Sequence, residues 1–151
     1  MKITTPKGWI IEFLRFAEPW QSHEYFTNIE GSVITEKAVF LFEDHFYREY
    51  AKPSDFEKEL GRFIDFYLDN REMILLKTKT AVNGIMVHNH DFVDRDDVNY
   101  IISHIEILYL KRYEFKIHFV FLYGYVSYEI FFEVLSPENF VINKIERILN
   151  H

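Results

Sequence analysis

The 151-residue chain has no cysteine, only five glycines and four prolines, and fewer basic than acidic residues. The absence of cysteine excludes disulfide frameworks, zinc–thiolate sites and cysteine nucleophiles. It also suits a reducing compartment, and we expect the protein to be cytoplasmic. The few glycines form no G-x-G-x-x-G or G-x-x-x-x-G-K phosphate-binding loop, and no serine lies in a G-x-S-x-G elbow. The sequence therefore carries no common catalytic motif.

Positive charge and long apolar runs are also scarce. The chain has 17 basic and 24 acidic residues and a net charge of −7, whereas a protein that binds the phosphate backbone needs a surplus of lysine and arginine. The most apolar segment, residues 117–128, is shorter than the ~20 residues that cross a bilayer. We therefore expect neither direct nucleic-acid binding nor membrane insertion.

What the chain does contain is a large apolar and aromatic fraction. Hydrophobic residues make up 48%, with 16 phenylalanines, 10 tyrosines and 2 tryptophans, which is enough for a substantial core. No linker, repeat or low-complexity tract divides the sequence, and its length fits one domain. We therefore predict a single α+β domain over residues 1–151.

The first half predicts a strand and two helices. Both parities of residues 9–16 are mostly apolar, as in a strand with neighbours on both sides. Residues 35–50 have helical spacing, although a strand over 39–42 is an alternative that stays open. A helix over 54–70 is clearer, because Ser54 and Glu57 form a capping-box pattern before an apolar stripe.

The second half favours strands. Asn83-Gly84 is a typical hairpin turn between residues 73–80 and 85–90. Residues 98–110 fit either a helix or a strand, and we favour a strand for their second half. Segments 115–123 and 125–135 are aromatic and β-branched, as strands are. Ser136-Pro137 then predicts the start of a C-terminal helix. The expected fold is an antiparallel sheet, mostly a meander, with two or three helices in a single layer.

His88 and His90 are the most conspicuous candidate metal ligands. On a strand, a His-x-His pair projects both imidazoles to one face, which is a usable metal-ligand spacing. The predicted hairpin would place Lys77 and Lys79 on that same face, and two ammonium groups disfavour a bound cation. We therefore treat the two histidines as weak metal candidates on a polar hairpin face, and we predict no cofactor.

A second candidate site is an acidic cluster that precedes the predicted strand. Its carboxylates are too irregularly spaced for an EF-hand loop, which also requires a glycine. The cluster fits either a solvated loop or an acidic contact surface for a basic protein. The expected contact residues are Asp91, Asp94, Asp96, Asp97 and Tyr100.

Separately, Glu129, Phe131 and Glu133 share a parity and should line one face of their strand, most simply the exposed one.

Three functions from different classes fit this sequence. The preferred hypothesis is a protein-binding module without enzymatic activity: a bacterial immunity protein, or antitoxin, that neutralises a basic toxin such as a nuclease by direct binding. Its negative charge would steer association with a basic partner. The alternatives are a self-associating accessory or regulatory subunit and, less favoured, a metal-dependent hydrolase that uses His88 and His90.

Overall fold

The computed structural model describes residues 1–15, 17–31, 38–89, 100–121, 126–136 and 138–149. The strands are β1 (Lys2–Thr4), β2 (Trp9–Arg15), β3 (Pro19–Ser22), β4 (Thr27–Asn28), β5 (Phe40–Glu43), β6 (Tyr100–Tyr109), β7 (Glu114–Phe121), β8 (Val126–Ser136) and β9 (Asn139–Leu149). The helices are α1 (Asp44–Arg48), α2 (Pro53–Asp69), α3 (Arg71–Asn89) and the 3₁₀ turn η1 (Leu110–Arg112).

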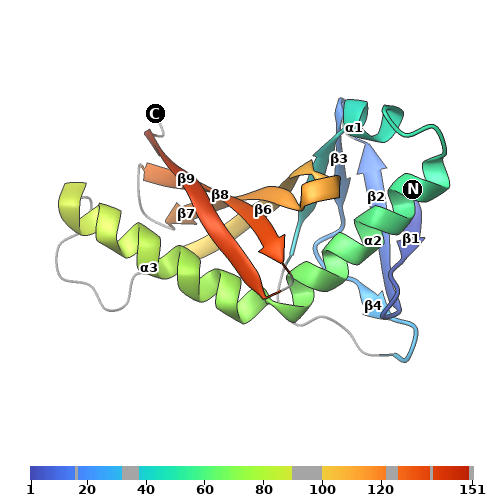
Figure 1. The fold of residues 1–151 in the computed structure, drawn as a ribbon, viewed down its shortest axis with the longest axis horizontal. Coiled ribbons are helices and arrows are strands. Elements are labelled where there is room, and N and C mark those ends of the chain that lie inside the picture. The colour runs from blue at the N-terminus through green and yellow to red at the C-terminus, as the bar shows by residue number, and fades with distance from the viewer. Residues whose placement is uncertain (16, 32–37, 90–99, 122–125, 137, 150–151) are drawn as a thin grey trace.

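The strands form one nine-stranded sheet in the order β1-β2-β3-β5-β6-β7-β8-β9, with β4 paired to β2 (Figure 1). All neighbours are antiparallel except β5 and β6, where Phe40 lies opposite Ile105 and Phe42 opposite Ile107. That parallel pair requires the chain to cross back between the two strands, and α1, α2 and α3 lie in this connection. The predicted combination of helices with a mostly antiparallel sheet is confirmed.

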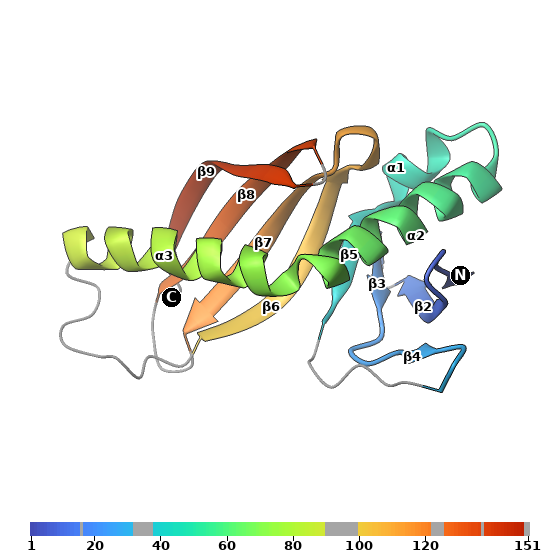
Figure 2. The ribbon, with the colours of Figure 1, turned by 60° about the horizontal axis from the view of Figure 1, so that its bottom comes forward.

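Helix α2 packs its predicted apolar stripe on the sheet. Its residues Phe56, Leu60, Phe63 and Ile64 are fully buried. The Phe63 ring lies 5.3 Å from that of Phe115 on β7. Figures 1 and 2 place α2 and α3 on the same side of strands β6 to β9. The capping box is wrong, however, because α2 begins after Lys52 with Pro53 in its first turn and no side-chain cap.

The predicted hairpin at Asn83-Gly84 is wrong, because these residues lie inside α3. A two-residue type I′ turn needs positive φ at both central positions, and neither residue has it. Instead, Ile74, Thr78 and Val82 recur every four residues and are fully buried, so helical burial outweighs the local turn signal. Thr78 adapts to the helix by donating its hydroxyl to the Ile74 carbonyl at 2.8 Å.

This correction removes the predicted basic hairpin face. Lys77 and Lys79 are two positions apart on a helix and point in different directions. The ammonium of Lys77 lies over the Phe140 ring, 5.3 Å from its centroid. His88 lies near the end of α3, and His90 is outside the described residues.

The predicted C-terminal helix is also wrong, because this segment is strand β9. It pairs with β8 from Val126↔Leu149 to Ser136↔Asn139, and Ile145 lies opposite Ile130. Its β-branched residues favour an extended backbone, and pairing satisfies the hydrogen-bonding groups of β8 that would otherwise form a sheet edge. The ladder therefore outweighs the Ser-Pro helix signal.

The remaining predictions divide more evenly. The strand alternative for residues 39–42 is confirmed by β5, and only a five-residue helix, α1, follows it. The strand preferred for the second half of 98–110 is confirmed by β6, which already begins at Tyr100, and the next two predicted strands correspond to β7 and β8. Helix spacing misled at 35–50 because Phe40 and Phe42, which alternate with Leu41 and Glu43, are buried in the sheet.

Candidate functional site

Strands β6 to β9 carry a polar face on the side opposite α2. Along each strand, polar residues alternate with buried ones such as Ile105, Phe115 and Ile130, so the two sets point to opposite sides. We use the name "polar face" for ten residues: His104, Glu106, Glu114, Lys116, His118, Glu129, Phe131, Glu133, Lys144 and Glu146. The prediction that Glu129, Phe131 and Glu133 share one side of a strand is confirmed, although all three are half-buried and not fully exposed.

Strand register arranges the polar face in rows that cross the sheet. One row runs Glu106, Lys116, Phe131 and Lys144, with one residue from each strand. Both lysines lie over the Phe131 ring, with Nζ 5.6 Å (Lys116) and 5.1 Å (Lys144) from its centroid. Cations at this distance are attracted to the face of an aromatic ring. The row therefore presents one phenylalanine between two positive charges.

Lys116 is the central cation of this face. Its Nζ lies 2.9 Å from Glu106 Oε2 and 3.3 Å from Glu129 Oε2, and all three side chains are about 16–20% exposed. Burial lowers the pKa of Lys116, but the hydrogen bonds and charges of both carboxylates outweigh it and raise that pKa above its usual value. Lys116 therefore stays charged and is shared between two carboxylates.

A second row contains two histidines and two glutamates. It runs His104, His118, Glu129 and Glu146, and the two imidazoles lie 4.8 Å apart between ring centroids. His118 Nδ1 lies 3.5 Å from Glu129 Oε1. His104 Nδ1 lies 3.3 Å from the Ser103 hydroxyl. Glu129 is thus the acceptor that joins the two rows.

The environment of His104 predicts a stability that depends on pH. Burial lowers the pKa of His104, and the neighbouring His118 and Lys116 lower it further, against the opposing charges of Glu106 and Glu129. The unfolded chain therefore binds more protons than the folded chain near and below pH 6.5, so stability falls as the pH drops from 7 to 5. We expect His104→Asn to lose less stability over this range than the unmodified protein, measured by urea denaturation at each pH. Equal losses in the two proteins would contradict this assignment.

The polar face is acidic overall. It holds five glutamates and two lysines, an excess of three negative charges with the histidines neutral. Two glutamate pairs lie directly opposite each other on neighbouring strands, Glu114 with Glu133 and Glu129 with Glu146. Directly opposed like charges destabilise a sheet. Neighbours offset part of this cost, because Lys116 and Lys144 bind Glu129 and Glu146, and Asn143 donates to Glu133 at 3.0 Å.

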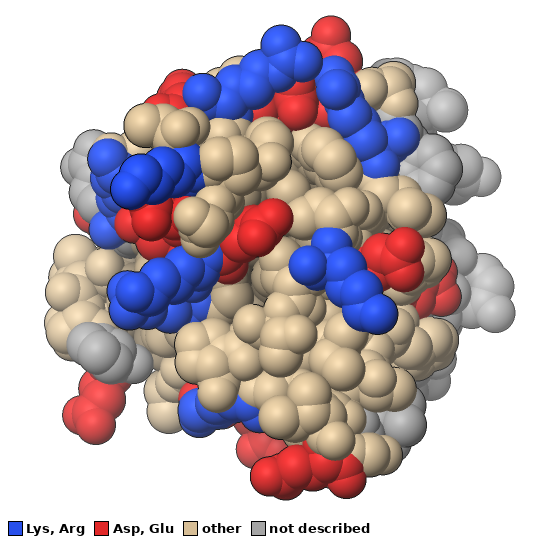
Figure 3. Space-filling model, turned by 90° about the vertical axis from the view of Figure 1, so that its right-hand side faces the viewer, with Lys and Arg blue, Asp and Glu red and all other residues tan. Residues whose placement is uncertain are grey.

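Charge is distributed differently at the end of the molecule that lies at the right of Figure 1. There, acidic and basic side chains are interspersed across the surface (Figure 3). At the neighbouring α1 corner, Asp44 accepts from Trp20 Nε1 at 3.0 Å and binds Arg15 and Arg48. The hydrogen bond from Trp20 and the charges of Arg15 and Arg48 lower the pKa of Asp44, although burial opposes them. The Asp44 carboxylate at this corner is therefore shared by two arginines.

The structure does not test the contact residues predicted from sequence. Asp91, Asp94, Asp96 and Asp97 lie outside the described residues, and Tyr100 is the first residue of β6. Within the described part of the chain, no three histidine, aspartate or glutamate side chains gather as metal ligands, and no helix is long and apolar enough to cross a membrane. From the sequence we did not predict that His104, Glu106 and Lys116 lie together. The alternation of polar and apolar residues in 104–107 and 114–118 is the signal that could have indicated it.

The chain matches no protein-family model, no curated protein and no solved structure.

Proposed function

We propose that this chain is a protein-binding module whose polar face docks on a basic protein, and that it acts by binding alone and not as an enzyme. The specific form that we propose is an immunity protein that neutralises a basic toxin, such as a nuclease. The observation that carries the proposal is that two pairs of glutamates lie directly opposite each other on the side of β6 to β9 that faces away from α2. Like charges placed opposite each other lower folding stability, and a positively charged partner would remove that cost on binding.

Two further features support a protein partner. Phe131 offers an aromatic contact at the centre of the face, and aromatic residues are enriched in the cores of interfaces. The net charge of −7 would add long-range attraction and accelerate encounter with a basic partner. The carboxylates of Asp91, Asp94, Asp96 and Asp97 are part of this net negative charge and would add to the attraction.

The test uses the double charge reversal Glu114→Lys/Glu133→Lys. Protein captured from the source organism by the immobilised chain is identified, purified and titrated against the chain at several salt concentrations. We expect a basic partner, weaker binding at higher salt, and at least tenfold weaker binding to the double variant. If the partner is a toxin, one equivalent of the chain should suppress its activity.

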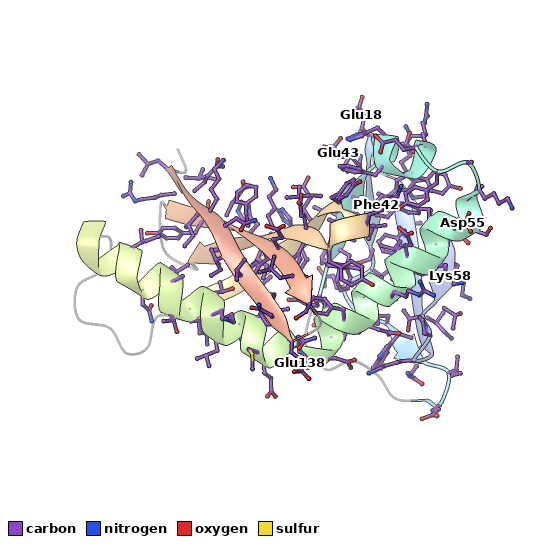
Figure 4. The ribbon with its side chains drawn as sticks, viewed as in Figure 1. Glu18, Phe42, Glu43, Asp55, Lys58 and Glu138 are labelled. Atoms are coloured by element: carbon purple, nitrogen blue, oxygen red, sulfur yellow. The ribbon has the colours of Figure 1, made fainter. Side chains whose placement is uncertain are left out.

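The matched control is Glu18→Lys/Glu30→Lys, which makes the same change in net charge at exposed positions outside the polar face. Glu18 is labelled in Figure 4 near α1. We expect this control to weaken binding less than threefold. Equal losses of affinity in the two double variants would mean that net charge alone, and not the polar face, determines binding. Affinity that is insensitive to salt and to both charge reversals would overturn the proposal.

A further inference from the structure

A separate aromatic cavity lies on the helix side of the sheet. Its volume is about 200 Å³, and it lies where β5 and β6 end and the connection between α1 and α2 begins. Five aromatic residues line it: Phe42, Phe46, Tyr50, Phe56 and Tyr109. Figure 4 labels Phe42 at this end of the sheet, close to α1. The cavity is on the side of the sheet opposite the polar face, because Phe42 and Phe56 belong to the buried core.

The walls of this cavity are held in place by ring contacts and one hydrogen bond. The Phe56 ring lies 5.0 Å from Phe42 and 5.2 Å from Tyr50 between centroids. The Tyr50 hydroxyl donates to the Glu59 carboxylate on α2. Burial and then Glu59 raise the pKa of Tyr50, so the donor stays protonated. The cavity is therefore preformed, which reduces the entropic cost of binding a ligand.

Its position in the sheet also favours ligand binding. Phe42 and Ile107 both line the cavity and lie opposite each other in the parallel β5–β6 pair. Both strands end within two residues of this point, so the cavity lies at the carboxyl end of the parallel pair. In open α/β sheets of mostly parallel strands, ligands bind outside the carboxyl ends of the strands, and this one parallel pair offers strand ends of the same kind.

We propose that this cavity binds one aromatic ring system of phenol to indole size. A closed apolar cavity of roughly 150 Å³ is known to hold benzene, so 200 Å³ accommodates one ring or a fused pair. Aromatic walls favour a planar guest through edge-to-face contacts. Two charged residues, Glu49 and Lys111, are also among the lining residues, and the Lys111 ammonium lies 6.0 Å from the centroid of the Tyr50 ring. They match a guest with a hydroxyl or N–H on its edge.

The test is an NMR titration of the isotope-labelled chain with phenol, indole and cyclohexanol. We expect phenol and indole to shift resonances of residues that line the cavity, and cyclohexanol to bind at least fivefold more weakly. A titration with N-acetyl-tyrosine amide then distinguishes the two sources of such a ring. Binding like that of phenol would assign the cavity to a tyrosine side chain of a peptide or protein. Weaker binding would assign it to a free small molecule.

The variant Ala51→Trp places a bulky side chain at an exposed position of the cavity wall. We expect it to weaken binding of indole at least tenfold, whereas Thr80→Trp on the exposed side of α3 should leave binding unchanged. Thermal melting of both variants shows whether they fold. Absence of cavity shifts with indole, or equal binding by the two folded variants, would overturn the proposal. Because the test needs only the chain itself, its failure would leave the proposed basic partner unaffected.

Discussion

Replacing Phe115 with alanine should lower the free energy of unfolding by about 4 kcal/mol. Phe115 is fully buried on β7 and stacks on Phe132 of β8, with centroids 5.0 Å apart and planes 6° from parallel. It also contacts Phe63 and Tyr67 of α2, so the ring joins two strands to the main helix. The substitution removes these contacts and leaves a cavity that neighbouring rings cannot fill without moving. Urea denaturation at pH 7 measures the loss.

The control for this prediction is Phe131→Ala, which removes the same side chain from the opposite side of the sheet. Phe131 is half-buried on the polar face, so we expect a loss of about 1 kcal/mol, mainly from its contacts with two lysine side chains. Similar losses for the two variants would mean that the core does not lie on the α2 side of the sheet. In a binding assay Phe131→Ala should lower the affinity for the partner more than Phe115→Ala, because Phe131 lies at the proposed interface and Phe115 does not.

Replacing Lys116 with methionine should lower the free energy of unfolding by about 2 kcal/mol at pH 7. The substitution leaves Glu106 and Glu129 close together, about 16–20% exposed, and without their shared cation. Removing one partner of a buried ion pair costs more free energy than the intact pair contributes, because the other charge is left buried and unpaired. Partial exposure to solvent reduces that cost here.

Removing the two carboxylates as well identifies the cause of this loss. Adding Glu106→Gln and Glu129→Gln to Lys116→Met should recover most of the lost free energy of unfolding at pH 7, because the two unpaired carboxylates are then absent. A triple variant as unstable as Lys116→Met would point to lost packing instead of unpaired charge.

The fold was predictable wherever one periodicity was unopposed. The apolar stripe of α2 and the alternation in β7 and β8 each bury one side, and all three elements are where the sequence places them. Prediction failed where a short local signal competed with long-range pairing. Asn83-Gly84 favours a turn, but burial of Ile74, Thr78 and Val82 keeps the helix intact.

The C-terminal segment gives a second example of this competition. Ser136-Pro137 favours a helix start, and the apolar residues after it allow either structure. The segment becomes a strand because it pairs with the side of β8 that β7 leaves available, and the sequence alone does not reveal which strands have such a side. The polar face was hidden for the same reason, because its rows join residues from four strands. Only the grouping of Glu129, Phe131 and Glu133 was accessible, since one strand carries all three.

The parallel β5–β6 pair has a consequence for the order of folding. It joins Phe40 to Ile105, whereas β6 to β9 are each paired with the next strand along the chain. Contacts between distant residues require closure of a long loop and form slowly, while contacts between neighbouring segments form early. The C-terminal meander is thus the part expected to assemble first and to act as the template on which the N-terminal strands dock. The proposed binding surface would then be in place before the aromatic cavity, which needs both halves of the chain.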